Sequence, residues 1–379
     1  MNNRRIRLAI TGGGTGGHVS PAVAVIEALQ KLAPTQGLEI LYIGSRDGAE
    51  ARIIPLMGVE YRGVSTGKLR RYFSWENLMD AARVPLGVLQ SLWHLLRFRP
   101  RALLATGGYV SVPAVIAAWL LRKPILVHEQ TGALGLANRI NARFATRIAL
   151  SVPGSERGLN KANWVLTGNP IRAAVRSGER TTAARRFRFD LQAPTVYVTG
   201  GAQGSHAINQ AVLGALPSLL GVAQVIHQCG DAEGVRADYE QLARKVAGLD
   251  PKLQSRYVLL RFVGSEIGEV YKLADLVVGR AGAGTVNELA TLGKPSILIP
   301  LPHAAGDEQR QNARRLKEAG AAVVIEESEL TPERLVSEVR TLLSDRERLK
   351  RMSEAGRGTG SGDAADRLAN LLLNLAGAR

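Results

Sequence analysis

Short apolar runs alternate along the chain with glycine-containing loops and with longer segments of helical periodicity. The first run, residues 6–10, leads into the loop Thr11–His18, and the helical pattern that follows is expected to open near Pro21. Further apolar runs occupy residues 39–44, 102–105 and 124–128. Alternation of this kind predicts an α/β domain with a parallel sheet and helices on both faces.

The second half of the chain repeats this arrangement. An apolar run at Thr195–Val198 leads into a second glycine loop, and a helical pattern (AINQAVLGAL) follows. The segments Thr11–His18 and Thr199–His206 are identical at five of eight positions. Because both lie between an expected strand and an expected helix, the sequence predicts two similar doubly wound domains.

Chain length supports the same division, since 379 residues exceed one typical domain and suit two. We expect the boundary within residues 163–172, which gives an N-terminal domain of residues 1–165 and a C-terminal domain of residues 166–359. The segment Gly356–Gly362 is expected to be a flexible link to a last amphipathic helix. That helix, within residues 360–379, is expected to join the N-terminal domain.

Composition narrows the class of protein. The single cysteine, Cys229, excludes an internal disulfide and suits a reducing cytoplasm, and the N-terminal segment lacks the apolar core of a signal peptide. The uncharged stretch 103–121 approaches the length of a membrane span, but its two glycines and Pro113 favour strand, loop and helix instead. The formal net charge of +16 is compatible with nucleic acid, with a membrane or phosphorylated substrates, or with an arginine-rich proteome.

Part of this positive charge lies in one dense basic cluster. Residues 68–101 hold seven Lys and Arg side chains against two acidic ones, interleaved with apolar and aromatic residues. An apolar stretch that carries tryptophan between arginines is typical of a segment lying in a membrane interface. An amphipathic helix with its apolar face in the core explains many of the same residues. The candidates for membrane contact are Trp75, Leu78, Met79, Trp93 and Arg97.

The first glycine loop satisfies the pattern G-x-G-x-x-G at residues 12–17. Glycines let the backbone approach a ligand, and the helix N-terminus behind them attracts an anion. Binding of NAD is disfavoured, because the second strand ends Gly44-Ser45-Arg46 without the acidic residue that holds the ribose. His18 follows the loop at the strand-end crevice, where it is either a general base or a capping and packing residue.

A second constellation lies in the C-terminal half. A strand at Asp275–Gly279 leads into a tight loop, and Thr285 with Glu288 forms a capping-box pattern. The same Glu288 carboxylate has the chemistry to accept hydrogen bonds from a ribose diol. Gln309 and Asn312 share one helical face, which suits hydroxyl or acetamido groups or, equally, solvent.

Several motifs are missing, and their absence limits the chemistry. The sequence holds no GxxxxGK[ST] loop, no G-x-S-x-G elbow, no HExxH and no D-x-D pair. A nucleotide-sugar enzyme without D-x-D must neutralise its leaving diphosphate with helix N-termini and cationic or hydroxyl side chains. We therefore expect no metal and no cofactor, with the two glycine loops acting as anion cradles.

The ordered set of motifs resembles the MurG family of UDP-N-acetylglucosamine transferases, which convert lipid I to lipid II. The resemblance runs from residue 6 to the C-terminal helix and is carried by GGTGGH, TGGYVS, HEQ, GNPIR, GGAQG, HQ-x-G and R-x-GAGT-x-x-E. It implies a GT-B fold, in which two Rossmann-like domains flank an interdomain cleft. It also implies an inverting, metal-independent transfer to the muramyl 4-hydroxyl.

The resemblance further implies a set of site residues. His18 matches the family's candidate catalytic base, and Glu288 matches the residue that holds the ribose. Val263 matches an apolar residue whose backbone reads uracil, and Arg172 matches a donor-site arginine. The remaining matched donor contacts are Thr15, Gly16, Gly17, Thr131, Ala202, Gln203, Ala283, Gly284, Thr285, Gln309 and Asn312.

Two of these positions depart from the family's pattern. Thr131 stands where the family has Asn after HEQ, and Ala202 stands where it has Ser in GGSQG. Each departure removes a side-chain hydrogen bond that contributes about 0.5–1.5 kcal/mol, so donor binding is expected to weaken or shift. Asn138, on the same segment as Thr131, is a candidate substitute amide.

The expected partners are UDP-N-acetylglucosamine, the lipid I acceptor and the anionic inner membrane, at whose cytoplasmic face the protein is expected to be peripheral. Nucleic acid is not expected as a partner. Another GT-B transferase with a lipid acceptor, such as a diacylglycerol glycosyltransferase, remains an alternative. A non-catalytic protein that binds nucleotide sugar or nucleic acid is the other.

Overall fold

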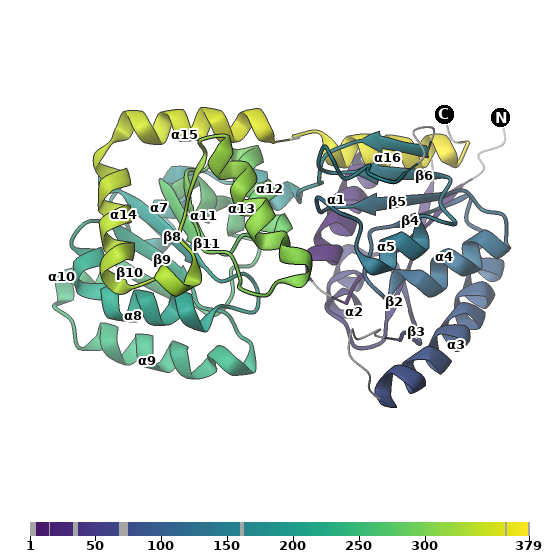
Figure 1. Ribbon diagram of the computed structural model, residues 1–379, viewed down its shortest axis with the longest axis horizontal. Coiled ribbons are helices and arrows are strands. Elements are labelled where there is room, and N and C mark those ends of the chain that lie inside the picture. The colour runs from purple at the N-terminus through teal and green to yellow at the C-terminus, as the bar shows by residue number, and fades with distance from the viewer. Residues whose placement is uncertain are drawn as a thin grey trace. The chain divides into compact units, whose positions relative to one another are not determined.

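The computed structural model of the chain describes residues 5–14, 16–32, 37–67, 75–159, 163–360 and 362–377, with only the backbone at 75–82 and 305 (Figure 1). The chain forms two compact units. Unit 1 comprises residues 1–172 and 361–379, and unit 2 comprises residues 173–360. The boundary between the two units therefore follows Arg172. This is the last residue of the expected range 163–172, and it lies seven residues beyond residue 165, where the N-terminal domain was expected to end.

Unit 1 is a parallel sheet with the strand order β3-β2-β1-β4-β5-β6-β7 within the described residues. Its strands are β1 (Ile6–Thr11), β2 (Leu38–Ser45), β3 (Glu60–Val64), β4 (Ala102–Ala105), β5 (Ile125–Glu129), β6 (Arg147–Leu150) and β7 (Trp164–Leu166). Its helices are α1 (Gly16–Leu32), α2 (Ala49–Ile53), η1 (Pro55–Met57), α3 (Trp75–Phe98), α4 (Ser111–Leu120), α5 (Leu136–Asn141) and α16 (Ala364–Leu375).

Two apolar cores, one on each face, hold the sheet of unit 1. In β1, Leu8 and Ile10 pack against α1 and α16, whereas Ala9 between them packs against α3 and α4 on the other face. The alternation follows from the period of two along a strand, and both faces are apolar because helices cover both (Figure 1). The uncharged stretch 103–121 forms β4, a loop and α4, which confirms the prediction.

Unit 2 has the strand order β10-β9-β8-β11-β12-β13. As in unit 1, the third strand along the chain lies at one edge, followed by the second and the first, and then by the fourth and the later strands. The two similar doubly wound domains are therefore confirmed. The strands are β8 (Thr195–Thr199), β9 (Gln224–Gln228), β10 (Tyr257–Leu260), β11 (Leu276–Gly279), β12 (Ser296–Leu298) and β13 (Ala322–Val324). The helices are α6 (Ala173–Arg176), α7 (Arg180–Phe187), α8 (His206–Leu220), η3 (Glu233–Val235), α9 (Arg236–Ala247), α10 (Pro251–Gln254), α11 (Ile267–Leu273), α12 (Ala283–Leu292), η4 (Ala305–Asp307), α13 (Glu308–Glu318), η5 (Glu327–Glu329), α14 (Pro332–Ser344) and α15 (Arg346–Thr359).

Two expected boundaries were wrong. Helix α1 begins at Gly16 rather than near Pro21, which lies inside the helix. The ring of Pro21 removes only the hydrogen bond to the carbonyl of residue 17, so packing of the buried face outweighs this loss. Helix α15 continues to Thr359, so Gly356 and Gly358 are helical rather than part of a flexible link.

Helix α16 ties the C-terminal end of the chain to unit 1. Its apolar face, with Leu368 and Leu372 fully buried, joins the same core as α1 and β1. An amphipathic helix of this length has little stability alone, so the buried face is what holds it folded.

We predict that Leu372→Ala lowers the free energy of unfolding of unit 1 by about 2–5 kcal/mol, because it leaves a cavity in that core. Urea denaturation followed by intrinsic fluorescence would measure the change. Leu89→Ala, the same substitution at a side chain that is 63% exposed, is the matched control and should change the stability little. Equal losses for the two variants would contradict the assignment of α16 to this core.

Candidate functional site

The first glycine loop lies at the switch point of unit 1, where β1 and β4 are adjacent and their connections diverge. The amide of Gly13 donates to the carbonyl of Gly107 across this point, at 3.3 Å. A β-carbon at Gly12 would fall 2.0 Å from the hydroxyl of Thr106, and one at Gly108 would fall 2.1 Å from the carbonyl of Gly13. The two loops therefore touch backbone to backbone, which only glycine permits.

His18 lies in the first turn of α1 and contacts the second of these loops. Its Nδ1 lies 3.2 Å from the carbonyl oxygen of Thr106, and the Thr106 hydroxyl donates to the His18 carbonyl at 2.8 Å. Gly107 and Gly108 pack against the imidazole ring. The histidine is thus held by the loop after β4, at the carboxyl end of the sheet.

The neighbours of Nδ1 decide which nitrogen of His18 carries the proton. The Thr106 carbonyl can only accept, so the contact is a hydrogen bond only if Nδ1 is protonated. The amide nitrogen of Gln130 lies 3.0 Å from the same Nδ1, while the buried Gln130 oxygen has no partner. If the Gln130 amide is rotated by 180°, its oxygen can also accept a hydrogen bond from Nδ1. We therefore assign the proton to Nδ1 and the lone pair to Nε2.

Burial lowers the pKa of His18 below its usual value, and the carboxylates of Glu129 and Glu50 act in the opposite direction. The imidazole is therefore neutral near pH 7. A neutral imidazole with its lone pair on Nε2 has the state that a general base requires.

The HEQ segment forms a buried hydrogen-bond network beneath His18. The Glu129 carboxylate accepts from the amide and hydroxyl of Thr131, at 3.0 and 2.7 Å. It also accepts from the Gly135 amide, at 3.1 Å, and from the Asn138 side chain, at 2.9 Å. Asn138 donates in addition to the carbonyl of His128 and is almost fully buried. Asn138 is therefore a structural residue, and its assignment as a substitute amide for a ligand was wrong.

The second glycine loop, residues 200–205, lies at the equivalent switch point of unit 2, between β8 and β11. Gly204 packs against Gly230 and the Cys229 carbonyl so closely that a β-carbon would fall 2.1 Å from that oxygen. Ser205 caps α8 by accepting from the amide of Ile208. Ala202 and Gln203 are exposed at the tip of the loop, where they are accessible to a ligand.

Glu288 is held in a defined orientation, although not by a capping box. Helix α12 begins at Ala283, with Gly282 as its N-cap, so Thr285 is the third helical residue rather than the cap. Ala283, Gly284 and Thr285 form the first turn. The hydroxyl of Tyr271, on α11, donates to the Glu288 carboxylate at 2.8 Å, and no sequence motif pointed to this partner.

Three other predicted donor contacts are anchored within unit 2. The Val263 amide donates to the side-chain oxygen of Gln228 at 3.1 Å, so any backbone contact from Val263 to a base would use its carbonyl. The Gln309 oxygen accepts from the Leu301 amide, which positions the loop after β12. Asn312 is 7% exposed and donates to the Ala281 carbonyl. Its amide nitrogen is therefore already used within the domain, and contact of Asn312 with a ligand stays a prediction.

Arg172, the last residue of unit 1 before the chain enters unit 2, ends the GNPIR motif and is partly buried. Its Nε is buried without a hydrogen-bond partner among the described residues. A buried guanidinium N–H without an acceptor is costly, and an anion would satisfy it.

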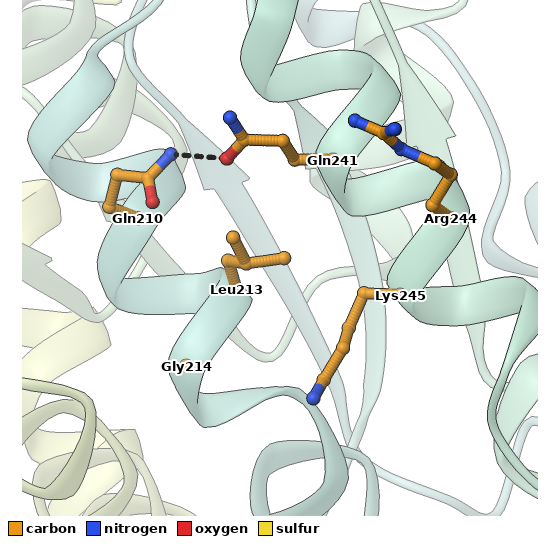
Figure 2. Close-up of a pocket in the computed structure, with 6 residues that line it drawn as sticks. All are labelled: Gln210, Leu213, Gly214, Gln241, Arg244 and Lys245. Atoms are coloured by element: carbon orange, nitrogen blue, oxygen red, sulfur yellow. Dashed lines mark hydrogen bonds between the residues drawn. The ribbon is translucent and has the colours of Figure 1, made fainter.

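The remaining predictions fall outside this site or outside the described side chains. Thr15 is not described, and the side chains of Trp75, Leu78 and Met79 are not described either. Gly16 and Gly17 are exposed at the start of α1. The groove between α8 and α9 in Figure 2 contains none of the predicted residues; it is lined by Gln210, Leu213, Gly214, Gln241, Arg244 and Lys245.

Helix α3 has two apolar stripes on its described part. Gly87, Ser91 and Leu95 face the sheet and are buried, as the core interpretation of this segment required. A second stripe is exposed, and Arg97 lies over the Trp93 ring at 5.8 Å. Among the described helices none is long and apolar enough to cross a bilayer. The exposed stripe holds Leu86, Leu89, Trp93 and Leu96, and α4, which packs against α3, exposes Trp119 and Leu120; these six side chains are together called the exposed apolar patch of α3 and α4.

Two doubly wound domains, each with a glycine loop at its switch point and a positioned carboxylate or histidine beside it, are the arrangement found in glycosyltransferases of the GT-B class. Family models give the same result. The N-terminal domain of glycosyltransferase family 28 matches residues 8–150, and the C-terminal domain of that family matches residues 195–368.

Individual relatives narrow the family. Two proteins named UDP-N-acetylglucosamine–N-acetylmuramyl-(pentapeptide) pyrophosphoryl-undecaprenol N-acetylglucosamine transferase match almost end to end. The one from Halothermothrix orenii is 36% identical over 98% of this chain and 99% of its own, and the one from Desulfitobacterium hafniense is 38% identical over 98% and 100%. The crystal structure of Acinetobacter baumannii MurG superposes with a TM-score of 0.71 at 26% identity, covering 97% of this chain and 99% of that one. The chain belongs to the MurG family.

The network around Glu129 generates a stability prediction. Asn138→Ala removes the donor to both Glu129 and the His128 carbonyl, and it should lower the free energy of unfolding of unit 1 by about 1–3 kcal/mol. Chemical denaturation would measure this loss. Asn374→Ala, the same substitution at an exposed position of α16, should change stability by less than about 0.5 kcal/mol. An Asn138 variant as stable as that control would show that the network does not hold the segment.

Proposed function

We propose that this chain transfers N-acetylglucosamine from UDP-N-acetylglucosamine to the muramyl 4-hydroxyl of undecaprenyl-pyrophosphoryl-N-acetylmuramyl-pentapeptide, the conversion of lipid I to lipid II in peptidoglycan synthesis. One observation carries this proposal. The relatives that bear the name of this transferase match both units, at 36% and 38% identity over 98% of the chain. A match confined to one unit would support donor binding alone.

The proposed step is a single displacement at the anomeric carbon. The lone pair on Nε2 of His18 removes the proton of the acceptor hydroxyl. The hydroxyl oxygen then forms a bond to the anomeric carbon while the bond from that carbon to the diphosphate oxygen breaks, so the configuration inverts. The products are the disaccharide lipid, UDP and a protonated His18, which returns its proton to water.

Donor binding is assigned chiefly to unit 2. Glu288, oriented by Tyr271, accepts hydrogen bonds from the ribose diol, and the Val263 carbonyl contacts the uracil. Gln309 and the exposed loop at Ala202 and Gln203 contact the sugar and diphosphate. The Ala202 departure leaves only backbone groups and Gln203 at that loop tip.

The leaving diphosphate requires positive charge without a metal ion. The N-termini of α8 and α12 present backbone N–H groups and a positive dipole end, and Arg172 offers a buried N–H that lacks an acceptor. Thr131, the other departure, spends its amide and hydroxyl on Glu129, so it supports the loop rather than replacing the family's amide at the ligand.

We predict that His18→Ala reduces turnover at least about 100-fold while leaving UDP affinity within about 3-fold of the wild type, because a general base contributes to the chemical step alone. UDP release with UDP-N-acetylglucosamine and lipid I would measure turnover, and calorimetry would measure UDP binding. A variant that keeps its turnover would contradict the role of His18 as the base.

The same assay discriminates the alternatives. Wild-type protein that releases UDP with diacylglycerol but not with lipid I would be a transferase with another acceptor, and one that binds UDP-N-acetylglucosamine without releasing UDP would be a binding protein. Because burial lowers the pKa of His18, the acid limb of the pH profile of kcat/KM should lie below pH 6.5.

We further propose that the protein is peripheral at the cytoplasmic face of the inner membrane and docks through the exposed apolar patch of α3 and α4. The patch presents Leu89 and Trp93 to solvent, at 63% and 58% exposure, and Arg97 lies beside the tryptophan. Large exposed apolar side chains next to arginine suit the interface of an anionic bilayer. The acceptor's lipid chain requires the enzyme to work at such a surface.

We predict that the double variant Leu89→Ser with Trp93→Ser has an affinity for phosphatidylglycerol vesicles that is at least about 10-fold lower. The reason is that two apolar side chains which would be buried in the membrane interface are replaced by polar ones. Vesicle sedimentation would measure binding. The double variant Ile53→Ser with Leu56→Ser, at exposed apolar residues outside the patch, is the control and should bind like the wild type. Equal binding by both variants would place the docking surface elsewhere.

A further inference from the structure

Glu50 is a buried carboxylate that the proposed chemistry does not use. It lies in the first turn of α2, after β2, and is 0% exposed. Among the described residues it forms no ion pair with a Lys, Arg or His side chain. A carboxylate without a cationic partner is costly to bury, so its hydrogen bonds must hold it in place.

Those hydrogen bonds connect α2 to the first glycine loop. One carboxylate oxygen accepts from the amide and the hydroxyl of Ser45, at 3.1 and 2.5 Å, and the other accepts from the amide of Gly14, at 3.3 Å. The Ser45 hydroxyl also accepts from the amide of Gly48, which fixes the turn that leads into α2. Every donor in this set lies at the carboxyl edge of the sheet, either at the end of β2 or in a loop.

The surrounding glycines make room for this carboxylate. A β-carbon at Gly13 would fall 2.4 Å from the carboxyl carbon of Glu50, and one at Gly48 would fall 2.4 Å from a carboxylate oxygen. A β-carbon at Gly44 would fall 2.9 Å from the Glu50 side chain. Glycines on three separate segments therefore leave space for one side chain, in addition to the space they leave for backbone packing.

We propose that Glu50 is a positioning residue for His18: it holds the first glycine loop through Gly14, so that α1 starts where His18 meets Thr106, and its negative charge stabilises the imidazolium that forms in the reaction. This inference rests on the proposed transfer reaction. The first loop thus spends the Gly14 amide on a carboxylate, while contact of its other backbone groups with the diphosphate stays a prediction.

Glu50 also explains why an acidic residue just past β2 does not indicate NAD binding. An acid that holds a ribose must present its oxygens to the crevice. Both oxygens of Glu50 are instead bound to Ser45 and Gly14, beneath the loop. The carboxylate therefore acts on the loop from inside the domain.

The test is the variant Glu50→Gln, which keeps the shape of the side chain but removes the charge and one acceptor. We expect kcat for transfer to fall at least about 10-fold, with the KM for UDP-N-acetylglucosamine within about 3-fold. Loss of the negative charge removes an influence that raises the pKa of His18. The acid limb of kcat/KM should therefore move to lower pH, a change that a merely structural role would not produce.

Two further variants separate position from charge. Glu50→Asp keeps the charge but shortens the reach to Gly14, so kcat should fall while the acid limb stays at the wild-type pH. Glu39→Gln removes a surface carboxylate of β2 that pairs with Arg5 and Arg7, and it should leave both quantities unchanged. A Glu50→Gln enzyme with wild-type kcat and an unmoved acid limb would overturn the proposal.

Folding failure has its own readout. If Glu50→Gln does not fold, Ser45→Ala tests the proposal instead, because it weakens the hydrogen bonds that hold Glu50 but keeps the carboxylate. It should lower kcat modestly without moving the acid limb. An unchanged kcat would overturn the proposal. Wild-type protein that fails to release UDP with lipid I would refute the proposed function instead. The two failures are therefore distinguishable.

Discussion

The close approach of backbone segments at the two switch points is the constraint on which the rest of the structure depends. In a doubly wound sheet the chain must leave one strand, turn tightly and enter a helix beside the loop of a neighbouring strand. Here the loops meet at Gly13 and Gly108 in unit 1, and at Gly204 and Gly230 in unit 2, where no β-carbon fits. His18 and the start of α8 are positioned by these contacts, so the glycines are as necessary to the chemistry as the side chains that perform it.

Both units reinforce this constraint with a buried carboxylate from the same place in the topology. Glu50 follows β2, the second strand of unit 1, and Asp238 follows β9, the second strand of unit 2. Asp238 is 1% exposed and binds His206, Asn209 and Gln210 at the start of α8. In one unit the carboxylate holds the loop, and in the other it holds the helix. Each is a fixed charge satisfied by hydrogen bonds, and each prevents the helix start from shifting.

The sequence predicted what depends on local pattern and missed what depends on contact between distant segments. Apolar runs and matched glycine loops predicted both doubly wound domains, because strand and helix periods are visible in any short window. The family motifs marked His18 and Glu288, but their partners Gln130 and Tyr271 emerge only from the folded chain. The hydrogen bond from Asn312 to the Ala281 carbonyl could not be predicted either, because a shared helical face does not reveal the partners of its side chains. The capping box at Thr285 failed because α12 starts earlier, with Gly282, three residues before Thr285, as its N-cap.

The proposed reaction creates charge of opposite sign at two places, and the fixed charges are arranged accordingly. The base becomes positive when it takes the acceptor proton, and the buried carboxylates Glu50 and Glu129 both favour that state of His18. Burial lowers the pKa of His18, and these carboxylates restore part of its basicity without adding solvent. The departing diphosphate becomes more negative, and the N–H groups of α8 and α12, with the unpartnered Nε of Arg172, favour that change. Such a division requires each charge to be fixed before the substrates arrive. This requirement gives a physical reason for burying the carboxylates Glu50 and Glu129 near His18, and for a buried Arg172 Nε that has no acceptor among the described residues.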